Sequence, residues 1–328
     1  MTMTIEARGL VKRFDGTTAL DGVDLDAPAG SILGVLGPNG SGKTTTVRIL
    51  ATLLRPDAGS VTVAGYDALR DPVSVRGLIG LTGQYASADE ELTGVENLEM
   101  IGRLLEMPTR QARARARELI SRFDLTEAGK RPVKTYSGGM RRRIDLAASL
   151  VGRPQVIYLD EPTTGLDPRS REELWRIVRE LSDEGTTILL TTQYLEEADQ
   201  LADQVAVLDR GKVVAEGGPA ELKRRVGAQT LRVLPTDRGD IPTVVSILTE
   251  LSGREPAVSP EHGLVTVPTD DPVMLSAVVR RLDNEAIEAD EVALRLPSLD
   301  SIFLALTGHP AEASAVESTP TAPEKSPA

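Results

Sequence analysis

The sequence has 328 residues, of which 40% are hydrophobic, so a large folded core is expected and global disorder is not. Its formal net charge of −12 argues against nucleic acid as a main partner, because nucleic-acid binding requires a basic face, and against docking on anionic lipid. The sequence contains no cysteine, which excludes disulfides, thiolate catalysis and cysteine-ligated metals.

Short apolar segments recur up to about residue 217, with helical patterns between many of them. None approaches the roughly 18 continuous apolar residues of a spanning helix, so we expect no direct membrane insertion. Parallel strands buried on both faces read as continuous apolar runs, so the pattern predicts an α/β core around a central sheet. The segments are SILGVL (31–36), SVTVAG (60–65), QVIYL (155–159), TTILL (186–190) and QVAVLD (204–209).

The stretch 95–125 differs from this pattern, because two helical segments follow each other without a strand between them. VENLEMIGRLLEM begins at residue 95, and RQARARARELISRF begins at residue 110. We interpret them as part of a helical subdomain, about residues 85–150, that is inserted into the α/β core.

A glycine-rich motif, GPNGSGKT, matches the pattern G-x-x-x-x-G-K-[ST] of phosphate-binding loops. An apolar strand precedes it and a helical pattern follows, which is the context that the motif requires. Glycines let the backbone N–H groups approach phosphate oxygens, and the helix dipole favours the negative charge. We expect Lys43 to reach the β- and γ-phosphates of ATP and the Thr44 hydroxyl to bind Mg²⁺. The predicted loop comprises Gly37, Pro38, Asn39, Gly40, Ser41, Gly42, Lys43, Thr44 and the following Thr45.

Two carboxylates end a second apolar strand, in QVIYLDEPTTGLD (155–167). A buried parallel strand delivers such residues to the carboxyl edge of its sheet, where ligands bind in α/β folds. Asp160 suits a place beside Mg²⁺, directly or through water, and Glu161 suits a general base that polarises an attacking water.

A second candidate anion site lies between these elements, in TYSGGMRRRIDLAASL (135–150). Ser137, Gly138 and Gly139 open a helix, so the backbone N–H groups and the serine hydroxyl face outward. This start alone would be ordinary. Together with the phosphate loop and the acidic strand it resembles the signature of ABC-type ATPases, and the resemblance covers residues 5–217 in order. It implies a P-loop ATPase core with antiparallel β and helical subdomains.

The resemblance also implies roles for residues that no local pattern identifies. Phe14 would stack on adenine, with an ordinary core aromatic as the alternative. Gln84 would sense Mg²⁺ and the γ-phosphate alongside Thr44 and Asp160, with a plain loop amide as the alternative. Asp167 would lie in a loop that crosses a dimer interface.

In such a dimer two copies pack head to tail, and ATP on the Lys43 loop of one copy is enclosed by Ser137 of the other. The resemblance therefore implies a homodimer or a closely related partner. Tyr136 and Met140 replace the commoner leucine and glutamine of the signature, while the serine and both glycines remain.

The sequence predicts a second unit from about residue 228, where segments read as strand, helix, strand, helix, strand. That order predicts a small α/β domain of ferredoxin-like type over residues 228–310, after a nucleotide-binding domain over residues 1–227. Its last segment, PSLDSIFLALTGH, reads as a short amphipathic helix. Residues 311–328 are rich in Pro, Ala, Ser, Thr and Glu and are predicted to be disordered.

Gln193, in TTQYLEEADQLAD, occupies the position where the family commonly has histidine. Glutamine keeps a donor and an acceptor but has no proton that titrates near neutral pH. Proton handling therefore falls to Glu161, and Gln193 is predicted to sense the γ-phosphate. With the PSLDSIFLALTGH segment and the acidic second unit, this stretch resembles the ATP-binding subunits of daunorubicin/doxorubicin-type drug exporters.

That resemblance implies an ATPase at the cytoplasmic face of the cell membrane, held there by a separate permease, which exports an anthracycline-like or lipid-like product. One alternative is a non-transport ABC ATPase in translation or repair, although neither tandem cassettes nor a long coiled coil is present. Another is a regulatory module that holds ATP, against which intact Lys43, Asp160 and Glu161 argue.

Overall fold

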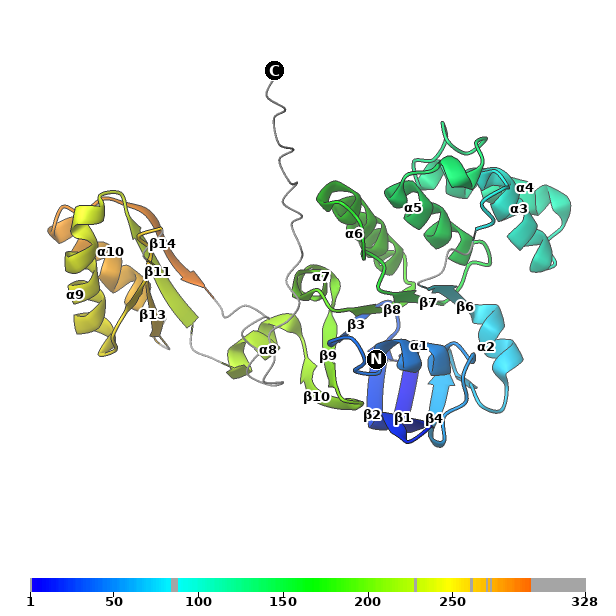
Figure 1. The fold of residues 1–328 in the computed structure, drawn as a ribbon, viewed down its shortest axis with the longest axis horizontal. Coiled ribbons are helices and arrows are strands. Elements are labelled where there is room, and N and C mark those ends of the chain that lie inside the picture. Colours follow the sequence, from blue (N-terminus) through cyan, green and yellow to red (C-terminus); the bar gives the residue numbers. More distant parts are fainter. Residues whose placement is uncertain are drawn as a thin grey trace, which may run out of the picture.

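The computed structural model describes residues 2–83, 88–226, 229–259, 262–269, 271 and 273–295. Gln84, the whole PSLDSIFLALTGH segment and the predicted tail 311–328 lie outside these residues. Figure 1 shows the course of the chain through its three sheets.

A six-stranded sheet forms the centre of the larger unit, in the order β10-β9-β3-β8-β7-β6. All but the edge strand β10 are parallel, and β3, β7 and β8 are buried along their whole length, as their continuous apolar runs predict. The predicted α/β core is therefore confirmed. The strands are β3 (Ile32–Leu36), β6 (Ile79–Thr82), β7 (Val156–Asp160), β8 (Thr187–Thr192), β9 (Gln204–Asp209) and β10 (Lys212–Gly217).

An antiparallel sheet in the order β2-β1-β4-β5 packs beside the central one. The segment SVTVAG, which the sequence pattern placed among the core strands, belongs to this sheet, where its partner is the long strand β1. Residues of β1 and β2 alternate irregularly between buried and exposed, so these strands do not stand out as apolar runs. The strands are β1 (Met3–Phe14), β2 (Thr17–Pro28), β4 (Ala58–Val63) and β5 (Tyr66–Asp67).

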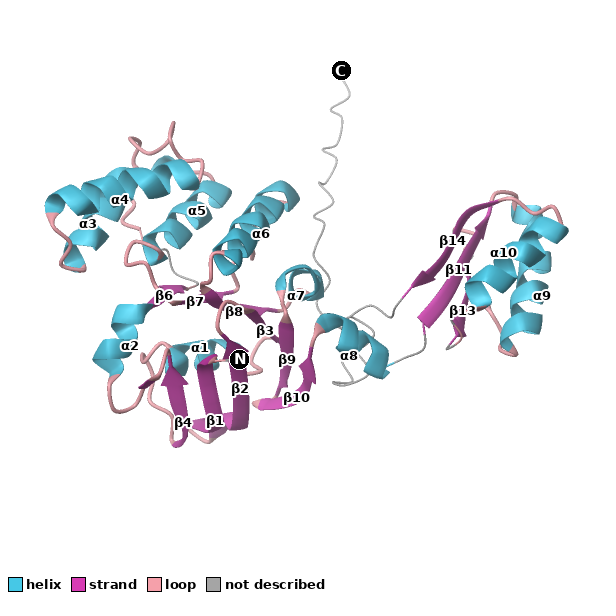
Figure 2. Cartoon of the chain, turned by 180° about the vertical axis from the view of Figure 1, so that it is seen from behind, coloured by secondary structure: helices cyan, strands magenta, loops and turns pink. Residues whose placement is uncertain are grey.

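Each face of the central sheet has its own hydrophobic core. Side chains alternate along a strand, so Ile157 and Leu159 of β7 join the core beneath the helices, whereas Val156 and Tyr158 join the core shared with the antiparallel sheet. Figure 2 shows α5 (Gly138–Ser149) and α6 (Pro168–Asp183) on one side of the central sheet and α1 (Lys43–Leu50) with the antiparallel sheet on the other.

The predicted helical insertion is confirmed as two packed helices, α3 (Gly94–Leu104) and α4 (Thr109–Arg122), followed by α5 (Gly138–Ser149). Thr93 and Glu96 form a capping box that fixes the start of α3. Tyr136, one of the departures from the signature, is buried here and donates its hydroxyl to the Ala128 carbonyl at 2.9 Å. The other helices are α2 (Pro72–Leu78), η1 (Val133–Thr135), α6 (Pro168–Asp183), α7 (Leu195–Leu201) and α8 (Pro219–Val226).

The C-terminal unit has one strand more than the predicted order of strand, helix, strand, helix, strand, and its observed order, strand–helix–strand–strand–helix–strand, is that of the expected ferredoxin-like type, with an antiparallel sheet in the order β12-β13-β11-β14. The pattern missed β12, which has only two residues. The hydrophobic core of the C-terminal unit consists entirely of residues between 231 and 294. The elements are β11 (Gln229–Pro235), η2 (Arg238–Asp240), α9 (Ile241–Ser252), β12 (Ala257–Val258), β13 (Val265–Thr269), α10 (Met274–Asn284) and β14 (Ala289–Arg295).

This separate core predicts that Leu248→Ala destabilises the C-terminal unit alone. Leu248 is fully buried on α9, so its truncation should cost about 2–5 kcal/mol of that unit's unfolding free energy. Differential scanning calorimetry should show one transition moving down while the transition of the preceding residues stays in place. Leu251→Ala on the same helix, where the side chain is 37% exposed, is the matched control and should cost about 0.5 kcal/mol. A single transition that shifts as a whole would contradict the prediction.

Candidate functional site

The phosphate-loop motif connects β3 to α1 and is anchored to the neighbouring strand. Gly37 N–H donates to the Thr192 carbonyl at the end of β8 (3.2 Å). Gly42, at the start of α1, has a φ of 110°, and a Cβ there would lie 2.6 Å from the Ala19 carbonyl oxygen, so only glycine fits. No side chain in the described part of the chain caps α1, so its first N–H groups remain available to an anion.

Lys43 lies at the centre of this loop. Its ammonium donates to the carbonyls of Gly37 (2.8 Å) and Pro38 (3.1 Å) and lies 3.3 Å from a carboxylate oxygen of Glu161. The Lys43 and Glu161 side chains are only 4% and 11% exposed, so their attraction is little screened by water. The structure thus places the expected phosphate ligand directly beside the expected base.

Asp160 connects the phosphate loop to the middle of the sheet. Its Oδ1 accepts hydrogen bonds from the Thr191 hydroxyl (2.6 Å) and the Thr44 hydroxyl (3.2 Å). Threonine and aspartate oxygens at this separation are the kind of donor set that Mg²⁺ takes together with phosphate oxygens and water. The residues present therefore fit the expected cation.

Glu161 has an unusual backbone. Its φ is 50°, in the left-handed region that few residues other than glycine adopt. Its N–H donates to both the carbonyl and the hydroxyl of Thr191 at 3.1 Å, and its own carbonyl accepts from Arg142 at 2.6 Å. Strained backbone of this kind persists only where surrounding contacts determine it.

Phe14 lines the same pocket as the phosphate loop. The ring is 44% exposed and the Lys12 ammonium lies 5.4 Å from its centroid, so Phe14 is not a core aromatic. An exposed ring at this place leaves a face free to stack on a base. The pocket, of about 340 Å³, is lined by Phe14, Ala19, Asn39, Gly40, Gly42, Lys43, Thr44, Thr45 and Glu161.

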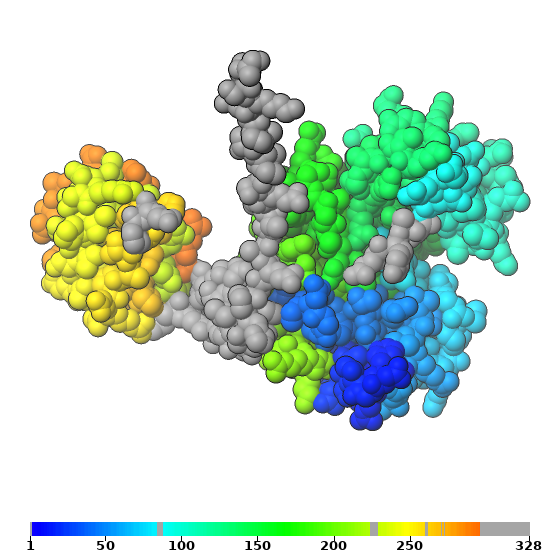
Figure 3. All heavy atoms as spheres, viewed as in Figure 1, coloured from blue at the N-terminus to red at the C-terminus, as the bar shows by residue number. Residues whose placement is uncertain are grey.

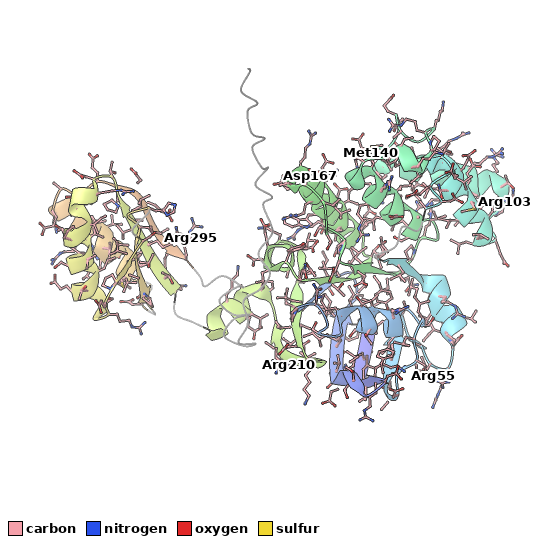
Figure 4. The ribbon with its side chains drawn as sticks, viewed as in Figure 1. Arg55, Arg103, Met140, Asp167, Arg210 and Arg295 are labelled. Carbon is pink, nitrogen blue, oxygen red and sulfur yellow. The ribbon has the colours of Figure 1, made fainter. Side chains whose placement is uncertain are left out.

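The signature residues lie outside the Lys43 pocket, at the start of α5. Ser137 caps α5, accepting from the Met140 N–H at 3.3 Å, and Asp167 caps α6, accepting from Ser170 N–H (3.0 Å) and Oγ (2.7 Å). The bonds from Ser170 lower the pKa of Asp167. A Cβ on Gly139 would lie 2.5 Å from the Ser170 hydroxyl, so the two helix starts pack closely, and Met140 and Asp167 mark their neighbouring ends in Figure 4.

A second pocket, of about 420 Å³, lies between these helix starts and the acidic strand. Gly138, Leu166 and Glu161 line it, and Glu161 also lines the pocket of Lys43. None of Ser137, Gly138 and Gly139 is among the described residues that line the Lys43 pocket. One chain therefore presents its two candidate anion sites separately, with Glu161 between them.

Gln193 follows β8 at the edge where the other candidate residues lie. Parallel pairing sets Thr191 opposite Asp160 and Thr192 opposite Leu36, so Gln193 lies between the ends of β7 and β3. Its Oε1 is buried and has no hydrogen-bond partner among the described residues. Such an atom is costly without a partner, which fits a side chain that meets a ligand.

Glu197 is a buried carboxylate that the sequence pattern did not identify. It is 0% exposed on α7, and its Oε1 accepts from the Trp175 indole at 3.2 Å. Burial raises the pKa of Glu197, and hydrogen bonding with Thr192, Trp175 and Thr163 opposes that rise. It thus adjoins both the β8 end that precedes Gln193 and the loop that leads to Asp167. Two glutamates stand side by side in the sequence, and periodicity alone did not show which one faces inward.

Arg142 and Asp145 on α5 were also missed. The Arg142 guanidinium contacts four backbone carbonyls around the acidic strand, and Asp145 is 4% exposed. They stand in a polar run, RRRID, that gives no sign of burial.

Comparisons with known proteins agree with this geometry. The family model described as ABC transporter matches residues 20–164. The chain is 52% identical over 309 residues to the daunorubicin resistance ATP-binding protein DrrA2 of Streptomyces coeruleorubidus, covering 94% of this chain and 96% of that protein. It is 51% identical to the daunorubicin/doxorubicin resistance ATP-binding protein DrrA of Streptomyces peucetius, covering 95% and 94%, respectively. It is 36% identical to the Nod factor export ATP-binding protein I of Ralstonia nicotianae, covering 94% of each.

Solved structures show the same fold. An ATP-binding cassette of an ABC transporter in its ADP conformation superposes with a TM-score of 0.62 at 26% identity, covering 69% of this chain and 95% of that one. A dimeric bacterial ABC transporter cassette gives a TM-score of 0.60 at 26% identity, covering 65% and 98%. The chain is therefore an ATPase of the ABC transporter family, in the group that includes the daunorubicin/doxorubicin resistance ATP-binding proteins.

Proposed function

We propose that this chain powers a two-component exporter, in which a separate membrane permease releases a hydrophobic antibiotic of anthracycline type or a lipid-like product. The observation that carries the proposal is the near full-length identity of 51–52% to proteins named for daunorubicin resistance. An intact phosphate loop with Glu161 beside Lys43 supports hydrolysis rather than mere nucleotide binding.

The site supports a division of roles. Phe14 stacks on adenine, and Lys43 with the loop N–H groups binds the phosphates. Thr44 and Asp160, with Gln84, hold Mg²⁺, which supplies charge neutralisation on the phosphates when bound. Glu161 takes the proton of the attacking water, and Gln193 orients that water against the γ-phosphate through its free Oε1.

The separation of the two candidate anion sites supports a head-to-tail homodimer. A nucleotide in the Lys43 pocket of one copy would be enclosed by Ser137–Gly139 of the other, with Asp167 in the loop near the interface. A relative of 26% identity has been solved as a dimer. Closure on ATP and opening after hydrolysis would then form a two-state switch.

The helical insertion offers a surface for the permease. Three apolar side chains at the end of α3 are exposed, Met100 by 37%, Leu104 by 75% and Leu105 by 48%. This part of the chain lies at the outer end of the larger unit in Figure 3, coloured cyan to green. We place the dock on the stretch 85–97 and this neighbouring apolar surface, because clustered exposed apolar residues mark interaction sites.

No helix in the described ranges is both long and apolar enough to cross a membrane. We propose that the chain works at the cytoplasmic face, bound through the permease, because of its identity to ATP-binding proteins named for drug resistance and for export. We propose that residues 1–227 form the nucleotide-binding domain and residues 228–310 an accessory domain.

Co-expression tests the proposed export. The chain and a co-expressed candidate permease should together lower daunorubicin accumulation in a sensitive bacterium, and neither should do so alone. The chain should sediment with membranes only when that permease is present. Lys43→Ala, which removes the phosphate ligand, is the control that should abolish export. Membrane retention without the permease, or equal accumulation with and without the pair, would contradict the proposal.

Glu161→Gln should bind ATP and accumulate a closed dimer while turnover falls at least about 100-fold, because the amide cannot accept the proton. Phosphate release gives the rate, and size-exclusion chromatography with ATP gives the dimer. Glu196→Gln, an exposed glutamate on α7, is the matched control and should behave as wild type. Wild-type turnover in Glu161→Gln would show that another group is the base.

Gln193→Ala should lower turnover about tenfold, the effect of losing one hydrogen bond to a charged group, while ATP affinity changes less. Gln200→Ala, on an exposed position of α7, controls for loss of a glutamine nearby. Steady-state kinetics and equilibrium binding separate the two effects. If Gln193→Ala turns over as fast as the control, the sensor role is wrong.

A further inference from the structure

Arg142 joins two loops that are far apart in the sequence. Its Nε donates to the Pro162 carbonyl (2.6 Å), its Nη2 to the carbonyls of Glu161 (2.6 Å) and Asp160 (3.2 Å), and its Nη1 to the Gly83 carbonyl (3.0 Å). Three of these carbonyls follow or end β7, and the fourth follows β6. A guanidinium presents its donors in a rigid planar fork, so these carbonyls are held in one fixed arrangement.

Asp145 lies one helical turn further along α5. Its Oδ1 accepts from the Ala88 N–H at 3.2 Å, and the side chain is almost completely buried. Burial lowers the pKa of Arg142. Nearby carboxylates raise this pKa again, and Asp145 has the largest effect among them. The Asp145 carboxylate therefore stabilises the buried Arg142 guanidinium, which donates hydrogen bonds to both loops.

Gly83 and Ala88 are the residues on either side of the stretch 84–87. One face of α5 thus holds the backbone on both sides of this stretch and, through the same guanidinium, the backbone of Glu161. The left-handed φ of Glu161 needs such external contacts, because its own preferences would favour another conformation. The same helix begins at Ser137.

We propose that Arg142 is a positioning residue that fixes the Glu161 backbone and joins it to Gly83, while Asp145, one turn along the same helix, holds Ala88 in the stretch 85–97 proposed above as the permease dock. A shift of Ala88 caused by the permease then reaches the Glu161 backbone through these two side chains of α5. The coupling half of this proposal rests on the proposed exporter function; the positioning half rests on the ATPase alone.

Arg142→Lys separates positioning from simple charge. A lysine keeps the charge but has one nitrogen, which cannot reach carbonyls on two loops at once. In the purified full-length chain we expect kcat to fall about tenfold or more, since small misplacement of a catalytic group is costly, while the Kd for ADP changes less than about threefold. Asp145→Asn keeps an acceptor for Ala88 but removes the charge, and we expect a smaller fall in kcat.

Arg115→Lys is the matched control. Arg115 is another poorly exposed arginine, at 11%, that donates to a backbone carbonyl, that of Leu150 (2.7 Å), but it lies on α4 and lines neither pocket of the candidate site. It should shift the melting temperature as Arg142→Lys does and leave kcat unchanged. A wild-type kcat in Arg142→Lys would overturn the proposal. So would a fall in kcat matched by an equal loss of ADP-binding sites, because that marks lost fold rather than lost positioning.

If Arg142→Lys does not fold, Asp145→Asn decides the matter by the same two measurements, and its wild-type kcat would overturn the proposal. In membranes with the permease, the ratio of stimulated to basal ATPase should fall toward one in Asp145→Asn, and an unchanged ratio would refute the coupling. A wild-type chain that the permease does not stimulate would instead count against the exporter function, and the kcat loss in Arg142→Lys would still stand.

Discussion

The parallel register of β3, β8 and β7 is the constraint on which the site depends. It sets Leu36 beside Thr192 and Thr191 beside Asp160, so the phosphate loop, Gln193 and the acidic pair all emerge at one edge. A slip of one residue would turn the polar ends of these strands into the hydrophobic cores on either face of the sheet. The two cores therefore fix the register, and the register brings the phosphate loop, Gln193 and the acidic pair together.

Most of the polar side chains named at this edge have an oppositely charged or a hydrogen-bonded partner. Lys43 is beside Glu161, Asp160 accepts from two threonine hydroxyls, and Arg142 donates to four backbone carbonyls. In a low-dielectric surrounding each partner matters more than it would in water, and removing one leaves the other at a high energetic cost. Among the described residues, the buried side-chain oxygens near this edge that have no hydrogen-bond partner include Gln193 Oε1 and the Ser41 hydroxyl of the phosphate loop, both at positions expected to meet the nucleotide or the attacking water.

Local sequence patterns predicted the strands and helices that are marked by apolar runs or by helical periodicity. Continuous apolar runs identified β3, β7, β8 and β9, and helical periodicity identified α3 to within three residues and α4 to within one. It failed at β1 and β2, where one-sided burial leaves no apolar run, and at the two-residue β12. Motifs located the residues that we propose to meet the nucleotide, but Arg142 and Glu197 make tertiary contacts to backbone or to Trp175, and neither kind of contact leaves a trace in the local sequence.

The left-handed backbone of Glu161 has a consequence for engineering. A non-glycine residue at such a φ costs about 1–3 kcal/mol, so this position weakens the fold at the residue that we propose as the general base. Selection of variants for heat resistance alone would favour glycine there and would yield robust, inactive proteins. Thermostabilised versions of this ATPase should therefore be sought at distant positions, with residue 161 held constant.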